Sequence, residues 1–214
     1  MSLRVLSTVI SFVRHGHVHN PQGILYGRLP RFGLSEKGYS QARVVAETLR
    51  GRPIAALYSS PMLRARQTAQ AILDVRPGLP LHISELINEV QSSYEGQPLA
   101  ELIASGWDLY HGSEYEQPHD VLDRALRFID RTRKRHMGQQ VVAVTHGDVI
   151  AAIICWVKRL SIHPHNRELL LGVGIPGGYP APASISTLTF HTVNRDLDYR
   201  PEFAYHALFQ EQTK

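Results

Sequence analysis

The chain has 214 residues, of which 43% are hydrophobic and 20% charged, and this composition argues against a disordered chain. Its formal net charge of +4 comes without a stripe of lysine and arginine interleaved with aromatic residues, so nucleic acid is not expected as a partner. The apolar run around Cys155 is too short to span a bilayer, and a membrane protein is not expected. A single cysteine excludes an internal disulfide, which fits a cytoplasmic protein.

Strand and helix patterns alternate along the chain. Short segments rich in β-branched and apolar residues predict strands over residues 8–13, 54–58, 81–84 and 141–145. Two further strands are predicted over residues 185–190 and 203–208, and these are expected to form an antiparallel pair at an edge of the sheet.

Helices are predicted in the segments between these strands. Ser35 is expected to cap a helix that runs to about residue 50, because apolar residues recur there at helical spacing. Ser60 and Pro61 are expected as the cap and first residue of a second helix. Another helix follows Pro118, with its apolar residues on one face, and a last one runs onward from Asp148.

This order of elements predicts the fold class. Alternating strands and helices form a three-layer α/β/α fold with a mostly parallel central sheet. No repeat or low-complexity linker divides the chain, so residues 1–214 are expected to form a single domain. In such folds, binding sites lie at the carboxyl ends of the strands.

Cationic and imidazole side chains follow three of the predicted strands. Arg14 and His15 follow the first strand, Arg64 follows the second, and His146 follows the strand over residues 141–145. Gathered at one rim of the sheet, these four groups would repel one another unless an anion lay between them. Because guanidinium groups match phosphate oxygens bidentately, the pattern predicts a phosphoryl site.

The chain resembles the histidine phosphatase (phosphoglycerate-mutase-like) superfamily, and three motifs in order carry the resemblance: Arg14-His15-Gly16, Ser59-Ser60-Pro61 with Arg64 and Gln67-Thr68-Ala69, and Thr145-His146-Gly147. Residues 27–38, followed by Gln41-Ala42, are also similar to the region after the first motif of that family. The motifs span most of the chain. The resemblance implies a phosphoglycerate-mutase-like fold and hydrolysis of a phosphorylated small molecule.

The resemblance also implies catalytic roles. His15 matches the nucleophile that becomes a phosphohistidine, and Arg14, Arg64 and His146 match the residues that bind the phosphate around it. A neutral imidazole can attack phosphorus near neutral pH, and cationic side chains can stabilise the equatorial oxygens. Neither a metal ion nor a cofactor is therefore expected.

The general acid is harder to place. The family has a glutamate between the second and third motifs, and a gapless match would put Asn88 there. Because asparagine cannot exchange a proton in this way, we choose Glu89 as the general acid and base, with Glu85 and Glu95 as the alternatives.

The loop after the first motif departs from the common pattern of the family. Asn20 comes six places after the arginine instead of seven, and we still expect its amide to bind the phosphate. Arg28 is expected to bind substrate, and His17, His19 and Tyr26 are expected beside it at the mouth of the site.

Simpler interpretations remain for single residues and for the whole chain. His15 alone could end a strand, His146 could be a core histidine, and Glu89 could be a loop carboxylate. The glycines between residues 172 and 178 are interpreted as a loop over the site or as a plain connection.

Two alternative functions also stay open. One is a cofactor-dependent phosphoglycerate mutase, and the other is a protein that binds phosphorylated ligands without turnover. A homodimer is possible, and the sequence does not name the substrate.

Overall fold

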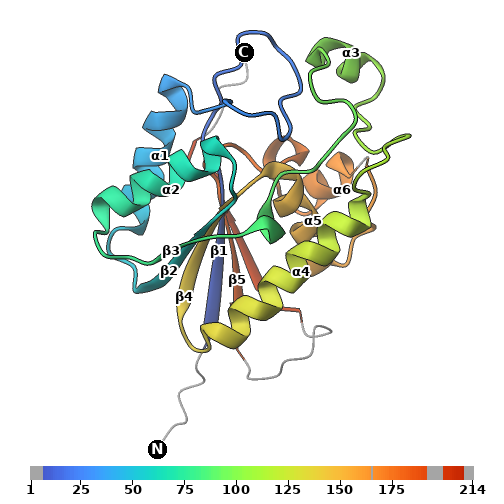
Figure 1. Cartoon of the computed structure of the whole chain (residues 1–214). Coiled ribbons are helices and arrows are strands. Elements are labelled where there is room, and N and C mark those ends of the chain that lie inside the picture. The colour runs from blue at the N-terminus through green and yellow to red at the C-terminus, as the bar shows by residue number, and fades with distance from the viewer. Residues whose placement is uncertain (1–6, 165, 192–199, 210–214) are drawn as a thin grey trace, which may run out of the picture.

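A single sheet organises the computed structural model, which describes residues 7–164, 166–191 and 200–209 (Figure 1). Within these residues the sheet has six strands in the order β3-β2-β4-β1-β5-β6. The strands are β1 (Thr8–Arg14), β2 (Ile54–Ser59), β3 (Leu81–Ile83), β4 (Gln140–Thr145), β5 (Ile185–Phe190) and β6 (Glu202–His206).

The four strands β1, β2, β3 and β4 run parallel to one another. Strand β5 runs antiparallel to β1, and β6 pairs antiparallel with β5 at the edge of the sheet. The prediction of a mostly parallel sheet with a late antiparallel pair at one edge is therefore confirmed.

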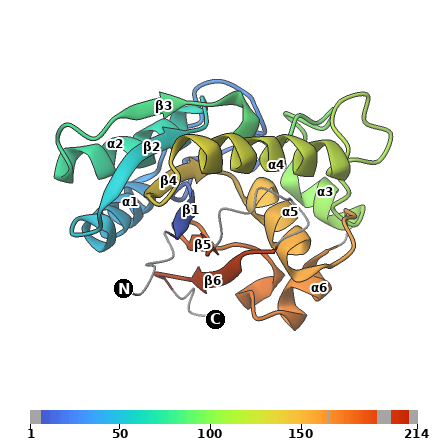
Figure 2. The same ribbon diagram turned by 90° about the horizontal axis from the view of Figure 1, so that it is seen from below.

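Helices cover both faces of this sheet (Figure 2). Helices α1 (Glu36–Leu49) and α2 (Leu63–Val75) lie on one face, and α4 (Pro118–Arg135) and α5 (Gly147–Lys158) lie on the other. Successive strand residues point to opposite faces, so Phe12 joins the core under α4 and α5 whereas Val13 joins the core under α1 and α2. The structure thus confirms the three-layer α/β/α prediction.

Helix α5 is apolar around its whole circumference. Residues 149–157 are all buried, because the helix packs against β1, α4 and α6. Cys155 is a buried free thiol in this segment. None of the helices in the described part of the chain is long and apolar enough to cross a membrane.

Two helix starts test the capping predictions. Ser35 caps α1 as predicted, since its side chain accepts a hydrogen bond from the backbone N–H of Gly38. The prediction that Ser60 caps the second helix and Pro61 begins it was wrong, because α2 begins at Leu63. The Ser60 hydroxyl lies instead 2.7 Å from Nε2 of His146.

Short elements between the layers were not predicted. They are α3 (Leu99–Ala104), α6 (Arg167–Gly172) and the 3-10 turns η1 (Glu85–Ile87) and η2 (Pro176–Gly178). The glycine-rich stretch expected as a loop forms the end of α6 and the turn η2. These pieces are too short for helical periodicity to show.

Candidate active site

The strand register brings the three motifs to one rim of the sheet. Arg14 of β1 pairs with Thr145 of β4 at the end of both strands, and His15 and His146 are the residues that follow them. The backbone N–H of His15 donates to the carbonyl of Thr145 at 3.0 Å, which fixes the two histidines side by side. Their ring centroids lie 5.1 Å apart.

His15 is held in one tautomer. Its Nδ1 lies 2.8 Å from the carbonyl oxygen of Gly16, which can only accept, so Nδ1 carries the proton. The lone pair of a neutral ring is then on Nε2, which accepts a hydrogen bond from Nε of Arg64 at 3.2 Å. Burial, together with the charges of Arg64, His146 and Arg14, holds the pKa of His15 well below its ordinary value. His15 is therefore a neutral imidazole with a directed lone pair.

His146 lies at the start of α5, beside Ser60 and Glu89. Nε2 of His146 is 2.7 Å from the Ser60 hydroxyl, and its Nδ1 is 3.1 Å from Oε2 of Glu89. Burial lowers the pKa of His146 to about 4, although the charge of Glu89 opposes the shift. A Cβ on the next residue, Gly147, would lie 2.3 Å from the Tyr179 hydroxyl, so a larger residue there would require Tyr179 to move.

Glu89 faces the two histidines from the loop after η1. Its Oε2 accepts from Nη2 of Arg64 at 3.1 Å, and its Oε1 accepts from the backbone N–H of Val90 at 3.0 Å. Burial alone would raise the pKa of Glu89, but His146 and then Arg64 and His15 hold it well below its ordinary value. Glu89 is a carboxylate in the free site.

The other candidates for the acid have different partners. Asn88 donates from its side-chain amide to Glu85 at 2.8 Å and accepts from the backbone N–H of Glu89. Oε1 of Glu95 accepts from the backbone N–H of Arg28 at 2.7 Å. Of these residues, the structure brings Glu89 into the cluster with His15 and His146.

Arg64, near the start of α2, contacts each member of this cluster. Its exposure is 1%, and Nη2 also donates to the carbonyl of Gly27 at 2.8 Å. His15, Glu89 and His146 offer ligand atoms within 4.8 Å of one another, a spacing that could hold a metal ion. Because the guanidinium already touches all three, a cation would have to displace a like charge. The donor set fits an anion better.

Arg14 closes the other side of the cluster. Its guanidinium donates from Nη1 to the carbonyl of Pro180 and lies 4.9 Å from the ring centroid of Tyr179. Its Nε is buried and has no hydrogen-bond partner among the residues that the structure describes. A buried donor without a partner is costly, and a phosphate oxygen would satisfy it.

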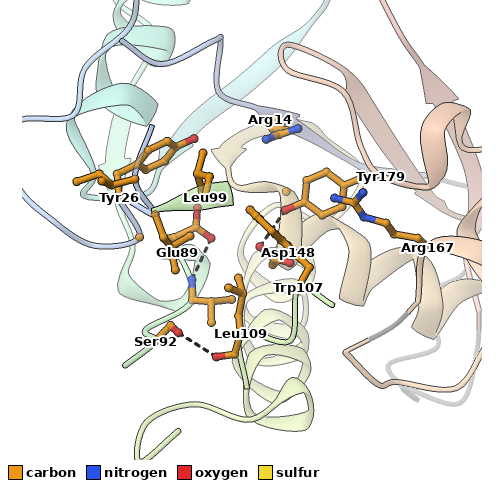
Figure 3. Close-up of a pocket in the computed structure, with 15 residues that line it drawn as sticks. Arg14, Tyr26, Glu89, Ser92, Leu99, Trp107, Leu109, Asp148, Arg167 and Tyr179 are labelled. Atoms are coloured by element: carbon orange, nitrogen blue, oxygen red, sulfur yellow. Dashed lines mark hydrogen bonds between the residues drawn. The ribbon is translucent and has the colours of Figure 1, made fainter. Parts of the chain in front are cut away.

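Two adjoining cavities open beside this cluster. One, of about 260 Å³, is lined by Glu89, and the other, of about 330 Å³, is lined by His15. Arg14, Tyr26 and Leu99 line both cavities. Figure 3 shows the Glu89 side chain and the Arg14 guanidinium turned toward the first cavity, which places the anion site where the two cavities meet.

The remaining predicted residues lie around these cavities in different ways. Asn20 lines the cavity of His15, but its amide holds its own loop, donating to the Ile24 carbonyl at 2.8 Å and accepting from the Ile24 N–H. His17 and Tyr26 line the same cavity. His19 is exposed and is not among the residues that line either cavity.

Arg28 is not among the residues that line either cavity. Its Nε donates to the backbone carbonyl of Glu89 at 2.8 Å, and its Nη2 pairs with Glu116 at 2.9 Å. This geometry gives no support to the predicted binding of substrate by Arg28. The guanidinium instead holds the backbone of the loop that carries Glu89.

Sequence reasoning missed Arg124 and Glu116, which complete this support. Arg124 is buried, donates to the carbonyls of Asn88 at 2.6 Å and Glu89 at 3.3 Å, and pairs with Glu116 at 2.6 Å. The sequence carried one signal: Arg124 lies on the apolar face of α4, three residues after Val121, where a charged residue is unexpected.

A second missed pair, Tyr179 and Asp148, lines the cavity beside Glu89. The Tyr179 hydroxyl donates to Oδ2 of Asp148 at 2.9 Å, as the dashed line in Figure 3 marks. Burial, with the nearby charge of Glu89, raises the pKa of Asp148 to about 6.

Comparison with known proteins gives matches over most of the chain. Residues 10–173 match the family described as the histidine phosphatase superfamily (branch 1). An uncharacterised protein of Mycobacterium tuberculosis is 34% identical over 175 residues, covering 77% of this chain and 86% of that protein. The metal-independent phosphoserine phosphatase of Arabidopsis thaliana is 30% identical over 169 residues, covering 72% and 70%.

A solved structure shares the fold. The mycobacterial glucosyl-3-phosphoglycerate phosphatase superposes with a TM-score of 0.73 at 24% identity, covering 93% of this chain and 97% of that one. At that identity the likeness establishes the architecture.

Proposed function

This chain belongs to the histidine phosphatase superfamily, and on that premise we propose that it hydrolyses phosphomonoesters through a phosphohistidine formed on His15. One observation carries the assignment of roles: the fixed lone pair on Nε2 of His15 lies within a buried cluster that also holds Arg64, His146 and Glu89. Related proteins of the family are phosphatases, and phosphoserine phosphatases are among them.

The first step transfers the phosphoryl group to His15. Nε2 forms the bond to phosphorus while the ester P–O bond breaks, and Arg14, Arg64 and His146 stabilise the charge on the equatorial oxygens. A bound phosphate takes Arg64 and His146 away from Glu89 and adds a negative charge nearby. Because both changes raise the pKa of Glu89, the carboxyl can hold the proton that it gives to the leaving oxygen.

The second step returns His15 to its starting state. Glu89, now a carboxylate, accepts a proton from a water molecule as the water oxygen attacks phosphorus. The N–P bond breaks, inorganic phosphate forms, and His15 is again neutral with its proton on Nδ1. No metal ion or cofactor is needed to balance either step.

Trapping the intermediate tests this proposal. Wild-type protein mixed with a phosphomonoester labelled with ³²P and quenched in alkali should retain label that is lost in acid, because phosphohistidine is acid-labile. His15→Ala should retain none and should lose phosphatase activity by at least about 10³-fold. His119→Ala, which changes an exposed histidine of α4, is the matched control. Label that survives acid treatment, or label on His15→Ala, would contradict the proposal.

The two alternative functions predict different outcomes. A phosphoglycerate mutase would isomerise 3-phosphoglycerate in the presence of 2,3-bisphosphoglycerate without net release of phosphate. A binding protein would release no more phosphate from an aryl phosphate than His15→Ala does. Hydrolysis with net release of phosphate is the result that we expect. The single-domain organisation, the cytoplasmic location and the homodimer stay predictions.

A further inference from the structure

The cavity beside Glu89 has a mainly apolar wall. Eight of its lining residues are aliphatic or aromatic: Ile24, Leu25, Tyr26, Val90, Leu99, Trp107, Leu109 and Tyr179. Figure 3 shows Leu109 at the end of the cavity away from Arg14, and Leu99 beside Tyr26 and Glu89. This composition is typical of a site that recognises an apolar group.

Several polar groups of the same wall are already satisfied within the protein. The Ser92 hydroxyl donates to the carbonyl of Leu109 at 2.9 Å, and Oδ2 of Asp148 accepts from the Tyr179 hydroxyl. Glu89 and Arg14 belong to the reaction centre. Arg167 lies at the exposed rim with its guanidinium over the rings of Trp107 and Tyr179, at 6.0 and 5.8 Å from their centroids.

The position of Glu89 decides which cavity receives the leaving group. A general acid must lie within hydrogen-bond reach of the oxygen that leaves, and Glu89 lines this cavity but not the one that His15 lines. The alcohol part of the ester therefore extends into the cavity with the apolar wall.

On these observations, and resting on the proposed function, we propose that the preferred substrates are phosphomonoesters of mainly apolar alcohols, with Trp107 selecting the leaving group. An arylalkyl group would bury its surface against the leucines and the indole ring. A polyhydroxylated group would leave hydroxyls without partners, which lowers affinity steeply. The cavity of about 260 Å³ has room for a group of the size of a phenyl ring and a short chain.

Matched alkyl esters test the preference. 2-Phenylethyl phosphate, glycerol 1-phosphate, phosphoserine and 3-phosphoglycerate all release alkoxides, so differences among them report recognition more than leaving-group chemistry. We expect kcat/KM for 2-phenylethyl phosphate to exceed that for each polar ester by about 10- to 100-fold, the range expected for burying a side-chain-sized apolar group.

Variants at position 107 test whether Trp107 selects the leaving group. Trp107→Ala should lower kcat/KM for 2-phenylethyl phosphate by a factor about 10-fold larger than the loss for glycerol 1-phosphate. Trp107→Phe should restore most of the loss, because it keeps an aromatic surface. Ile103→Ala, which removes an exposed side chain of α3 outside the cavity, is the control.

The outcomes distinguish a failure of the apolar substrate preference from a failure of the proposed phosphatase function. Faster hydrolysis of phosphoserine, 3-phosphoglycerate or glycerol 1-phosphate would overturn the apolar preference and leave the phosphohistidine mechanism intact. Equal loss on all esters in Trp107→Ala, without rescue by Trp107→Phe, would overturn the role of Trp107. If no ester were hydrolysed and no acid-labile phosphate formed on His15, the proposed function itself would fail.

Discussion

Oε2 of Glu89 lies 3.1 Å from Nδ1 of His146, and the same oxygen lies 3.1 Å from Nη2 of Arg64. The carboxylate thus contacts Arg64 and His146, two of the three groups that are expected to bind the phosphate. Glu89 thereby offsets the buried positive charge of Arg64 in the free site, where a charge without a partner would be costly. When substrate binds, its phosphate must take over these contacts from Glu89.

Replacing this carboxyl separates acid catalysis from phosphate binding. Glu89→Gln should lower kcat for alkyl phosphates by about 10²- to 10⁴-fold, because their alkoxide needs a proton as it leaves. An aryl phosphate such as p-nitrophenyl phosphate should lose far less in the transfer step, since its leaving group is already stable as an anion. The difference is measured as kcat/KM for both esters, because kcat/KM reports phosphoryl transfer to His15 and not the later hydrolysis that Glu89 also assists. Equal losses of kcat/KM on alkyl and aryl substrates would show that Glu89 is not the acid.

Substitution of Arg28 tests whether this residue positions Glu89 or binds the substrate. Its guanidinium holds the backbone of Glu89, so Arg28→Gln should lower kcat for alkyl phosphates about 10-fold with little change in KM. The aryl phosphate should be affected less, as for Glu89→Gln. A rise in KM of similar size for both esters would instead support the role in substrate binding that the sequence predicted. Arg66→Gln, an exposed arginine of α2, serves as the control.

The geometry of Arg64 should matter as much as its charge. Arg64→Lys keeps the positive charge but removes the planar fork that reaches His15, Glu89 and His146. We expect kcat/KM to fall by about 10²- to 10³-fold, and competitive inhibition by inorganic phosphate to weaken as well. Full activity in Arg64→Lys would mean that a point charge suffices and that bidentate contact is not used.

Asp148 gives a prediction about stability and pH. Its carboxyl has a pKa raised from 3.8 to about 6, so the folded protein binds more protons than the unfolded chain between these values. Stability from this group is therefore highest below about pH 4 and falls as the pH rises to about 6, above which the folded protein carries a buried charge. Asp148→Asn should remove that cost and raise the free energy of unfolding at pH 7.5 by about 1–2 kcal/mol.

Urea unfolding of both proteins at several pH values between 4 and 7.5 measures this effect. The two proteins should have similar stability at pH 4 and diverge as the pH rises. Asp123→Asn changes an exposed aspartate of α4 and should show no such divergence. A difference between wild type and Asp148→Asn that stayed constant with pH would show that the carboxyl does not titrate as described.

Local patterns in the sequence predicted much of the architecture. Strands such as β1 and β4 could be predicted because short runs of β-branched, apolar residues are typical of buried strands. Ser35 marked the start of α1 because its own side chain caps the helix. Ser60 carries the same local signal. Its hydroxyl instead contacts His146, 86 residues away in the chain, and no local rule could foresee that choice.

Local sequence patterns were therefore enough to predict the six strands, the four long helices, the mostly parallel sheet and the three motifs that end its strands, since each depends on residues close together in the chain. The packed fold was needed to show which carboxylate faces His15, that Arg28 and Arg124 hold the backbone at Glu89, and that Trp107 and Tyr179 line the cavity. These relations join elements that are far apart in the sequence. Side-chain direction and burial, which set them, exist only once the layers have packed.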